Sequence, residues 1–223
     1  MSVQKPKVET SSREYLLDVA ESLFLSKGID EVSLRAIVRA AGHKNPSALQ
    51  YHFGNREGLI EAIVGRRFQQ QETRRAQLLD AEKRKGHTLT LRDICAIQVA
   101  APYLLCREDP SFKDVLGAFG LRLLGTDIDH YSAEFNKGAP SLVALWELGS
   151  QYLEHLPPEV LTLRMQQTHG AAMLALSRRS RAKGSFRGRK ADLFFNDLVD
   201  EITAMLEAPI SESTRQYLGR QGD

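Results

Sequence analysis

A short stretch between residues 44 and 56 gathers polar side chains that suit contact with nucleic acid. The amides of Asn45 and Gln50 match the paired hydrogen-bonding groups on the adenine edge in the major groove. Phosphate oxygens can be held by basic and hydroxyl side chains and by the free amides at a helix N-terminus. For His52, partial burial against the next helix is an equal alternative. The predicted DNA-contacting residues are Ser33, Arg35, Lys44, Asn45, Ser47, Gln50, Tyr51, His52 and Arg56.

Two short helices separated by a tight turn would position these residues. An apolar stripe at positions 34, 37, 38 and 41 predicts a helix that Ser33 opens and Gly42 ends. Asn45 followed by Pro46 predicts the capped start of a second helix over 46–53, which would pack through Leu49 and Phe53. This pattern is typical of a helix-turn-helix, in which the second helix lies in the major groove.

Over about residues 12–65 the pattern resembles the DNA-binding domain of TetR-type (tetracycline-repressor-like) transcriptional regulators. The features that carry the resemblance are a first helix ending at Gly28, Ser33 before the second, Ala41-Gly42 in the turn, and the run YHFGNREGL from residue 51. The turn at 43–46 is one residue longer than the commonest form, and Gln50 replaces a frequent aromatic. Both departures concern the operator sequence and not the fold.

The resemblance implies an all-α fold. An N-terminal three-helix, helix-turn-helix head at 12–58 would be joined by a bridging helix to a helical body at 59–208, which binds an effector and forms a dimer. Residues 1–11 and 209–223 are expected to be flexible tails. Apolar periodicity predicts helices over 13–27, 88–106, 110–124, 140–156, 158–181 and 189–208, and one long helix from 56 to about 85. On that long helix Arg74 and Arg75 are expected to be solvated, with DNA contact as the weaker alternative.

Composition agrees with an ordinary globular protein. The 223 residues are 42% apolar and 26% charged, and the net charge of +2 does not by itself indicate a nucleic-acid binder. Residues 33–67, however, hold six basic side chains and two acidic ones.

Cys95 and Cys106 would lie roughly 16 Å apart on one helix, too far for a disulfide, and are expected to be buried thiols in a reducing cytoplasm. Without a signal peptide or an apolar run of about 20 residues, we expect a cytoplasmic protein with no membrane contact.

The middle helices of the body are expected to line an effector pocket. The candidate residues are Tyr103, Phe119, Arg122, Trp146, Met165 and His169, for which ordinary core packing is the alternative. A large apolar or amphipathic effector, such as an acyl-CoA, is suggested by these residues and by a run of seven bases and no acid at 178–190. That run could also contact DNA, or be a solvated loop balanced by the acidic residues of 192–201.

These patterns predict a ligand-responsive transcriptional regulator, in particular a repressor. It would bind a palindromic or pseudo-palindromic DNA operator as a homodimer formed through the last two helices. No catalytic, metal-binding or phosphate-cradling motif is evident, so we expect no enzyme activity, no metal and no cofactor. Two alternatives remain open at this point: an effector-independent DNA-binding protein, which would lack a sizeable cavity, and an all-helical enzyme.

Overall fold

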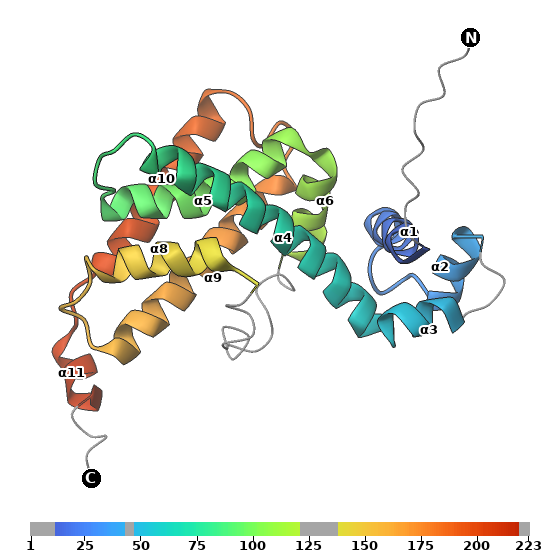
Figure 1. Ribbon diagram of the computed structural model, residues 1–223, viewed down its shortest axis with the longest axis horizontal. Helices are drawn as coiled ribbons and strands as arrows, with labels where there is room; N and C mark the ends of the chain where they lie inside the picture. Colours follow the sequence, from blue (N-terminus) through green and yellow to red (C-terminus); the bar gives the residue numbers. More distant parts are fainter. Residues whose placement is uncertain (1–11, 43–46, 121–137, 219–223) are drawn as a thin grey trace.

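A computed structural model describes residues 12–42, 47–120 and 138–218. Within these ranges the regular structure is entirely helical, as predicted. The head consists of α1 (Ser12–Lys27), α2 (Leu34–Ala40) and α3 (Ser47–Phe53), and α4 (Arg56–Lys83) leads from it into the body. The body consists of α5 (Leu91–Glu108), α6 (Pro110–Phe119), α8 (Pro140–Ser150), α9 (Pro158–Ser180) and α10 (Arg189–Glu207), and α11 (Glu212–Leu218) follows it. Figure 1 shows the head at one end of the long α4 and the body packed around its other end.

The helix starts follow from local capping. Ser33 accepts a hydrogen bond from the amide of Ala36 at 3.2 Å, and Asp109 accepts one from the amide of Ser111 at 2.9 Å, so both predicted starts are confirmed. The helix predicted from residue 88 begins instead at Leu91, because Thr90 and Asp93 form a capping box there. The helix predicted over 140–156 ends at Ser150.

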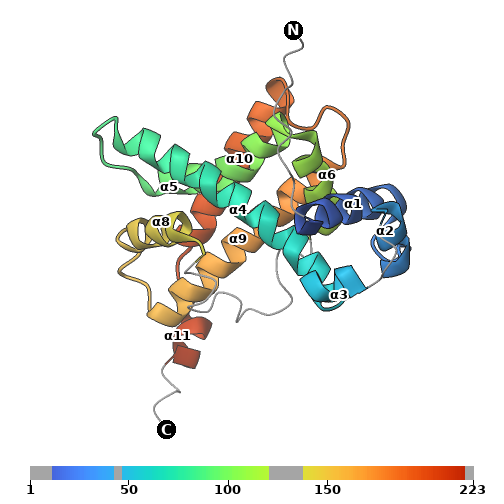
Figure 2. The same cartoon turned by 45° about the vertical axis from the view of Figure 1, so that its right-hand side comes forward.

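Head and body share a continuous interior. The apolar core of the head contains the inner faces of α1, α2 and α3, the first two turns of α4, and also Val115 and Phe119 of α6. Two further clusters fill the body, one among α5, α6, α9 and α10 and one among α4, α5 and α8. The predicted boundary between residues 58 and 59 thus falls inside α4, and the apolar core of the head continues beyond it. Figure 2 shows α6 lying between α1 and α9.

Two close helix contacts depend on glycine. A Cβ at Gly58 would lie 2.2 Å from the carbonyl oxygen of Phe53, so only glycine lets the end of α3 meet the start of α4 this tightly. A Cβ at Gly120 would lie 2.0 Å from Oγ of Ser177, which brings the end of α6 against α9. The recognition helix and the joint between head and body are therefore both fixed by contacts that exclude a side chain.

Two expectations about polar segments were wrong. Arg75 is not solvated: its side chain is 1% exposed and is ion-paired with Glu72 at 2.6 Å. The segment after residue 208 is not only a tail, since residues 212–218 form α11, although none of its residues is buried.

Both free cysteines are buried, as expected. No helix among the described residues combines the length and the apolar character needed to cross a membrane.

Candidate nucleic-acid interface and body cavity

The third helix presents a polar face to solvent. Leu49 and Phe53 lie on the buried face of α3. Ser47, Gln50 and Tyr51 are exposed, and 86% of the surface of Tyr51 is accessible. Because the apolar positions face the head core, the remaining positions face outward at helical spacing. Lys44 and Asn45, which were predicted to belong to the same face, lie outside the described residues. The exposed set matches what a recognition helix needs at a base edge.

The second helix adds two exposed bases. Arg35 and Arg39 lie one turn apart on the outer face of α2, and within the described ranges neither forms an ion pair. Ser33 directly precedes them and uses its hydroxyl as the helix cap. A helix that crosses the phosphate backbone in front of the recognition helix requires such unpaired bases.

His52 is half-buried at the end of α3. Its ring lies 5.1 Å from the ring of Tyr51 in an edge-to-face arrangement and 6.0 Å from the ring of Phe53. The ring therefore packs among aromatic neighbours while one side stays accessible. Phosphate contact by His52 remains a prediction.

Arg56 has a role that the sequence did not reveal. Its guanidinium donates hydrogen bonds to the backbone carbonyls of Ile29 and Val32 and lies 5.4 Å from the ring centre of Phe24. These contacts tie the first turn of α4 to the loop between α1 and α2. These donors point into the head and not toward solvent, and contact of Arg56 with a DNA phosphate stays a prediction. The start of α4 is instead capped by Asn55, whose side chain accepts from the amide of Gly58 at 2.9 Å.

Replacing Arg56 by alanine is expected to destabilise the head, by about 1.5–3 kcal/mol, because two carbonyls lose a charged donor. DNA affinity should fall only through this loss of structure. The slope of log affinity against log salt should therefore stay that of the wild type, as measured by fluorescence anisotropy on one duplex at several salt concentrations. A stable Arg56→Ala protein with a reduced salt slope would restore the phosphate role.

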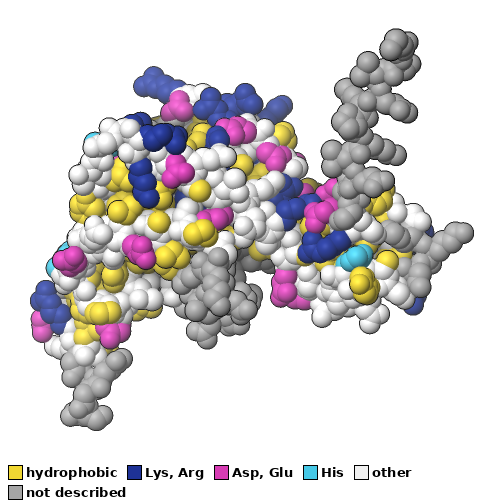
Figure 3. All heavy atoms as spheres, viewed as in Figure 1, with side chains coloured by type: hydrophobic (Ala, Val, Ile, Leu, Met, Phe, Trp, Pro, Cys, Tyr) yellow, Lys and Arg dark blue, Asp and Glu magenta, His cyan; other side chains and the backbone are white. Residues whose placement is uncertain are grey.

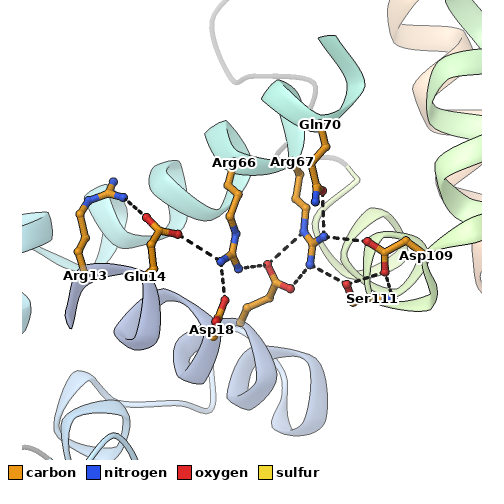
Figure 4. Close-up of polar contacts among 9 residues, drawn as sticks. Arg13, Glu14, Asp18, Arg66, Arg67, Gln70, Asp109 and Ser111 are labelled. Atoms are coloured by element: carbon orange, nitrogen blue, oxygen red, sulfur yellow. Dashed lines mark hydrogen bonds and ion pairs between the residues drawn. The ribbon is translucent and has the colours of Figure 1, made fainter. Parts of the chain in front are cut away.

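A network of charged side chains lies where the head meets the body. Arg66 of α4 donates to Asp18 at 2.5 Å and to Glu21 at 2.9 Å, both on α1. Arg67, which is 4% exposed, forms a bidentate pair with the same Glu21, donating from Nε to Oε2 at 3.2 Å and from Nη2 to Oε1. Figure 4 shows Glu14 joining Arg13 and Arg66 at the outer end of the network. The acidic face of α1 thus packs against α4.

The same network continues into the body. Arg67 also donates to Ser111 Oγ at 3.0 Å and is ion-paired with Asp109 at 3.4 Å. Asp109 is the N-cap of α6, so one arginine of α4 bridges α1 of the head and the first turn of α6 (Figure 4). Burial alone would lower the pKa of Arg66, but its hydrogen bonds to Glu21 and Asp18 raise it, so this pairing is ionic. Sequence reasoning missed these contacts, because the partners are more than 40 positions apart.

The body contains a small cavity among α5, α8, α9 and α10. Its volume is about 50 Å³, and it holds three of the predicted effector-contacting residues, Trp146, Met165 and His169. The other lining residues are Leu91, Ile94, Cys95, Gln98, Leu145, Gly149, Leu153, Thr168, Ala172, Ile202 and Leu206. Gln98 was missed, although it is the only amide in the apolar run 94–106 of α5, and that isolation was a usable signal.

The other predicted pocket residues lie elsewhere. Tyr103 is buried against the rings of Phe186 and Phe195, at 5.4 and 4.9 Å between centres. Phe119 is fully buried in the head core, edge-on to Phe24 at 6.1 Å. Neither lines this cavity, and core packing, the alternative named for them, accounts for the position of both residues. Arg122 lies outside the described residues.

The imidazole of His169 is held neutral. Burial, and secondarily the positive charge of Arg75, lowers the pKa of His169 to about 4. Its Nδ1 lies 2.8 Å from Nε2 of Gln98. A neutral imidazole can accept this amide hydrogen, so the pair forms a polar but uncharged part of the wall.

This shift in pKa predicts a pH dependence of stability. The folded-state pKa of His169, about 4, lies below the ordinary value, about 6.5, so the unfolded chain binds the extra proton between these values. Stability should therefore fall as the pH drops from about 6.5 to about 4, by at most about tenfold in the folding equilibrium constant per pH unit. Urea unfolding of wild type and His169→Gln at several pH values tests this, since the variant should lose the slope above pH 5. Parallel slopes would contradict a neutral buried His169.

The basic run at 178–190 is built into the loop between α9 and α10. Arg181 donates to the carbonyl of Gly117 at 3.1 Å, Arg187 donates to that of Arg107 at 3.3 Å, and Arg179 lies 4.2 Å from the ring centre of Phe194. Figure 3 shows basic side chains along the edge of the body above the start of α10. In the described part of the chain no ion pair joins the run to the acidic residues of α10, so the expected balance is not seen within one copy.

Comparison with known proteins agrees with this architecture. Residues 16–63 match the family model of bacterial regulatory proteins of the tetR family. The head is therefore of the tetR type. No curated protein matches the chain significantly. This match makes the head a DNA-binding domain and the chain a DNA-binding transcriptional regulator, and the described residues have an all-α fold.

Two solved structures extend the tetR-family likeness to the whole fold. Salmonella enterica GusR is 19% identical, with a TM-score of 0.55 over 92% of this chain and 100% of its own. A protein of Shewanella sp. PV-4 described as a tetR-family transcription regulator is 18% identical, with a TM-score of 0.60 over 87% of this chain and 96% of its own. At these identities the likeness concerns the fold alone, including a helical body behind the tetR-family head.

Proposed function

We propose that this tetR-family regulator is a ligand-responsive repressor, which binds a two-fold symmetric operator as a homodimer and is released by a small effector held in the body cavity. Sequence-specific DNA binding is supported mainly by the exposed polar face of α3. Ser47 and Gln50 lie on this face, and Leu49 and Phe53 lie on the buried face of the same helix. The residues proposed to contact DNA are Ser33, Arg35, Lys44, Asn45, Ser47, Gln50, Tyr51 and His52. Operator binding would place the protein in the cytoplasm.

Dimer formation is supported by apolar surface on the last two long helices. Leu163 and Leu174 of α9 and Leu193 and Met205 of α10 are exposed, Leu193 with 68% of its surface accessible. Such a surface favours pairing with a second copy. Two heads related by a two-fold axis would then meet successive major grooves.

Release by an effector would use the contacts between α9, α6 and the head. Met165 and His169 of α9 lie one turn apart and line the cavity. Ser177, about two turns further along α9, makes the close contact with Gly120 of α6. Phe119 of α6 enters the head core. A ligand that shifts α9 would favour a different position of α6 and hence of the head. Operator affinity would fall by as much as the ligand binds this conformation more tightly than the DNA-binding one.

The cavity bears on the suggested acyl-CoA effector and on the alternative of an all-helical enzyme. An acyl-CoA fits the described lining poorly, because that lining offers no basic side chain to hold its phosphates. An enzyme would need convergent titratable groups, whereas among the described lining residues only His169 and Cys95 titrate, and burial raises the pKa of the Cys95 thiol. An effector-independent regulator remains the second candidate, since a cavity of about 50 Å³ is smaller than common ligand pockets.

The proposal is tested by selecting duplexes from a random pool with the purified protein, then screening small molecules for release of the selected duplex. We expect a two-fold symmetric site and release by an uncharged small molecule. Binding without preference for any sequence at moderate salt would exclude an operator-specific repressor. Selection of an operator that no molecule releases would favour the effector-independent alternative.

Changing Gln50 to alanine is expected to relax the preference at one base pair of each half-site. The loss on the preferred base should be about 1–3 kcal/mol, because one bidentate amide contact disappears. The matched control is Arg35→Ala, which should weaken all duplexes alike and reduce the salt slope by about 1. Anisotropy titrations against operators varied one pair at a time measure both. Equal loss on every sequence for Gln50→Ala would remove its proposed role.

A further inference from the structure

The cavity in the body is lined almost entirely by apolar side chains. Besides the indole of Trp146, only Gln98, Thr168 and His169 among the described lining residues carry nitrogen or oxygen in their side chains. Among the residues that the structure describes, no Lys, Arg, Asp or Glu side chain lines it. A charged ligand would lose its hydration there without meeting a counter-charge, whereas a neutral one would not.

Among the described lining residues, the buried oxygen Oε1 of Gln98 has no hydrogen-bond partner. Thr168 uses its hydroxyl hydrogen within its own helix, with the carbonyls of Arg164 and Met165 at 2.8 and 3.1 Å. Gln98 directs Nε2 to Nδ1 of His169 at 2.8 Å, and the neutral imidazole accepts. The other amide atom, Oε1 of Gln98, is buried and has no hydrogen-bond partner. A buried acceptor left unpaired costs about 1–3 kcal/mol, which a ligand donor would recover.

We infer that the effector is a small neutral molecule, apolar except for one hydroxyl or N–H group that donates a hydrogen bond to Oε1 of Gln98. This inference rests on the proposed function, because it concerns the same cavity. It follows from the apolar lining, from the absence of charge in that lining and from the single unpaired acceptor.

The size of the cavity limits the effector to a compact molecule. A cavity of about 50 Å³ must widen even for one ring, since an engineered cavity that binds benzene measures about 150 Å³. Widening is possible at Met165, whose flexible thioether adapts its shape. Gly149 leaves space beside it: a Cβ there would meet Ile94, Leu91 and Met165 only at 3.8–3.9 Å. The effector is therefore expected to be the size of a substituted six-membered ring.

Four compounds of nearly equal size test the chemical class. Cyclohexanol carries a donor, cyclohexyl methyl ether an acceptor only, methylcyclohexane neither, and cyclohexanecarboxylate a charge. Trp146 is the single tryptophan of the chain and lines the cavity, so its emission reports binding without DNA. Cyclohexanol should bind about tenfold more tightly than the ether or the hydrocarbon, and the carboxylate should bind most weakly.

Three variants locate the effect. Gln98→Leu should abolish the preference for cyclohexanol while the hydrocarbon still binds, and Gly149→Leu should fill the cavity and weaken all four compounds. The matched control Gln216→Leu alters an exposed glutamine on α11 and should leave the preference unchanged. The comparison among compounds in the wild type stands even if a variant fails to fold.

Equal affinity for cyclohexanol and its ether, tightest binding of the carboxylate, or a preference that survives in Gln98→Leu would overturn the inference. So would an unchanged Trp146 emission with every compound up to its solubility limit. The proposed repressor function fails separately. If cyclohexanol binds with the expected preference but leaves operator affinity unchanged, the ligand class stands and ligand-responsive repression does not.

Discussion

Replacing Glu72 by glutamine is expected to lower the free energy of unfolding by about 3–5 kcal/mol, the usual effect of removing one partner of a buried ion pair. Arg75 is 1% exposed, and its only ion pair in the described structure is with Glu72 at 2.6 Å. Its Nε already lacks a hydrogen-bond partner. Burial lowers the pKa of Arg75, while Glu72 opposes that shift, so the variant would leave a buried charge with nothing to neutralise it.

The same substitution weakens the contact between α4 and α8. Glu72 accepts a hydrogen bond from the amide of Ser141 in the first turn of α8, and its own carbonyl accepts from Ser141 Oγ at 3.4 Å. A carboxylate at a helix N-terminus is favourable, and a neutral amide loses that part of the interaction. Loss of the charge therefore acts on two neighbours of Glu72 at once.

Urea unfolding followed by far-ultraviolet circular dichroism measures this effect. The matched control is the double variant Glu72→Gln, Arg75→Met, which removes the unpaired charge and should recover most of the stability. A loss under about 1 kcal/mol in Glu72→Gln would mean that Arg75 is hydrated and would contradict the buried pair.

Arg75 also shows where sequence reasoning fails. Periodicity assigns charged residues to solvent, and the run from 69 to 85 is rich in charge. Yet Arg67, Gln71, Glu72 and Arg75 are buried in α4. Arg75 pairs with Glu72 within the helix, and Arg67 and Glu72 in turn meet Glu21 of α1, Asp109 of α6 and Ser141 of α8. Those partners are about 40 to 70 positions away, and a single sequence does not reveal such pairs.

Local signals were reliable by contrast. The apolar stripes of α1, α2 and α3 formed the head core, and Gly42 adopts the left-handed conformation (φ 71°) expected after a helix. Apolar patterns identified helices but not which face lines a cavity. Trp146, Met165 and His169 meet there, whereas Phe119 and Tyr103 pack elsewhere. Choosing among buried aromatic residues required the packing of whole helices, which propensity does not determine.

Phe119 is the residue for which the difference between the predicted pocket position and the observed core position has the largest consequence. Its side chain is fully buried, contacts Phe24 of α1 and belongs to the head core although it lies on α6. Beside it, Gly120 is pressed against Ser177 of α9. A ring at this position therefore joins the head to the helix that lines the cavity.

Replacing Phe119 by alanine is expected to lower the free energy of unfolding by about 3–5 kcal/mol, through lost burial and the cavity left behind. Phe119→Leu is the matched control and should lose much less, since it keeps most of the apolar volume. Because Phe119 does not line the cavity, any small molecule that changes Trp146 emission should bind the folded leucine variant with wild-type affinity. Operator release by that molecule should weaken, because the contact from α6 into the head is looser. Reduced affinity for the molecule itself, with stability unchanged, would instead return Phe119 to the pocket wall.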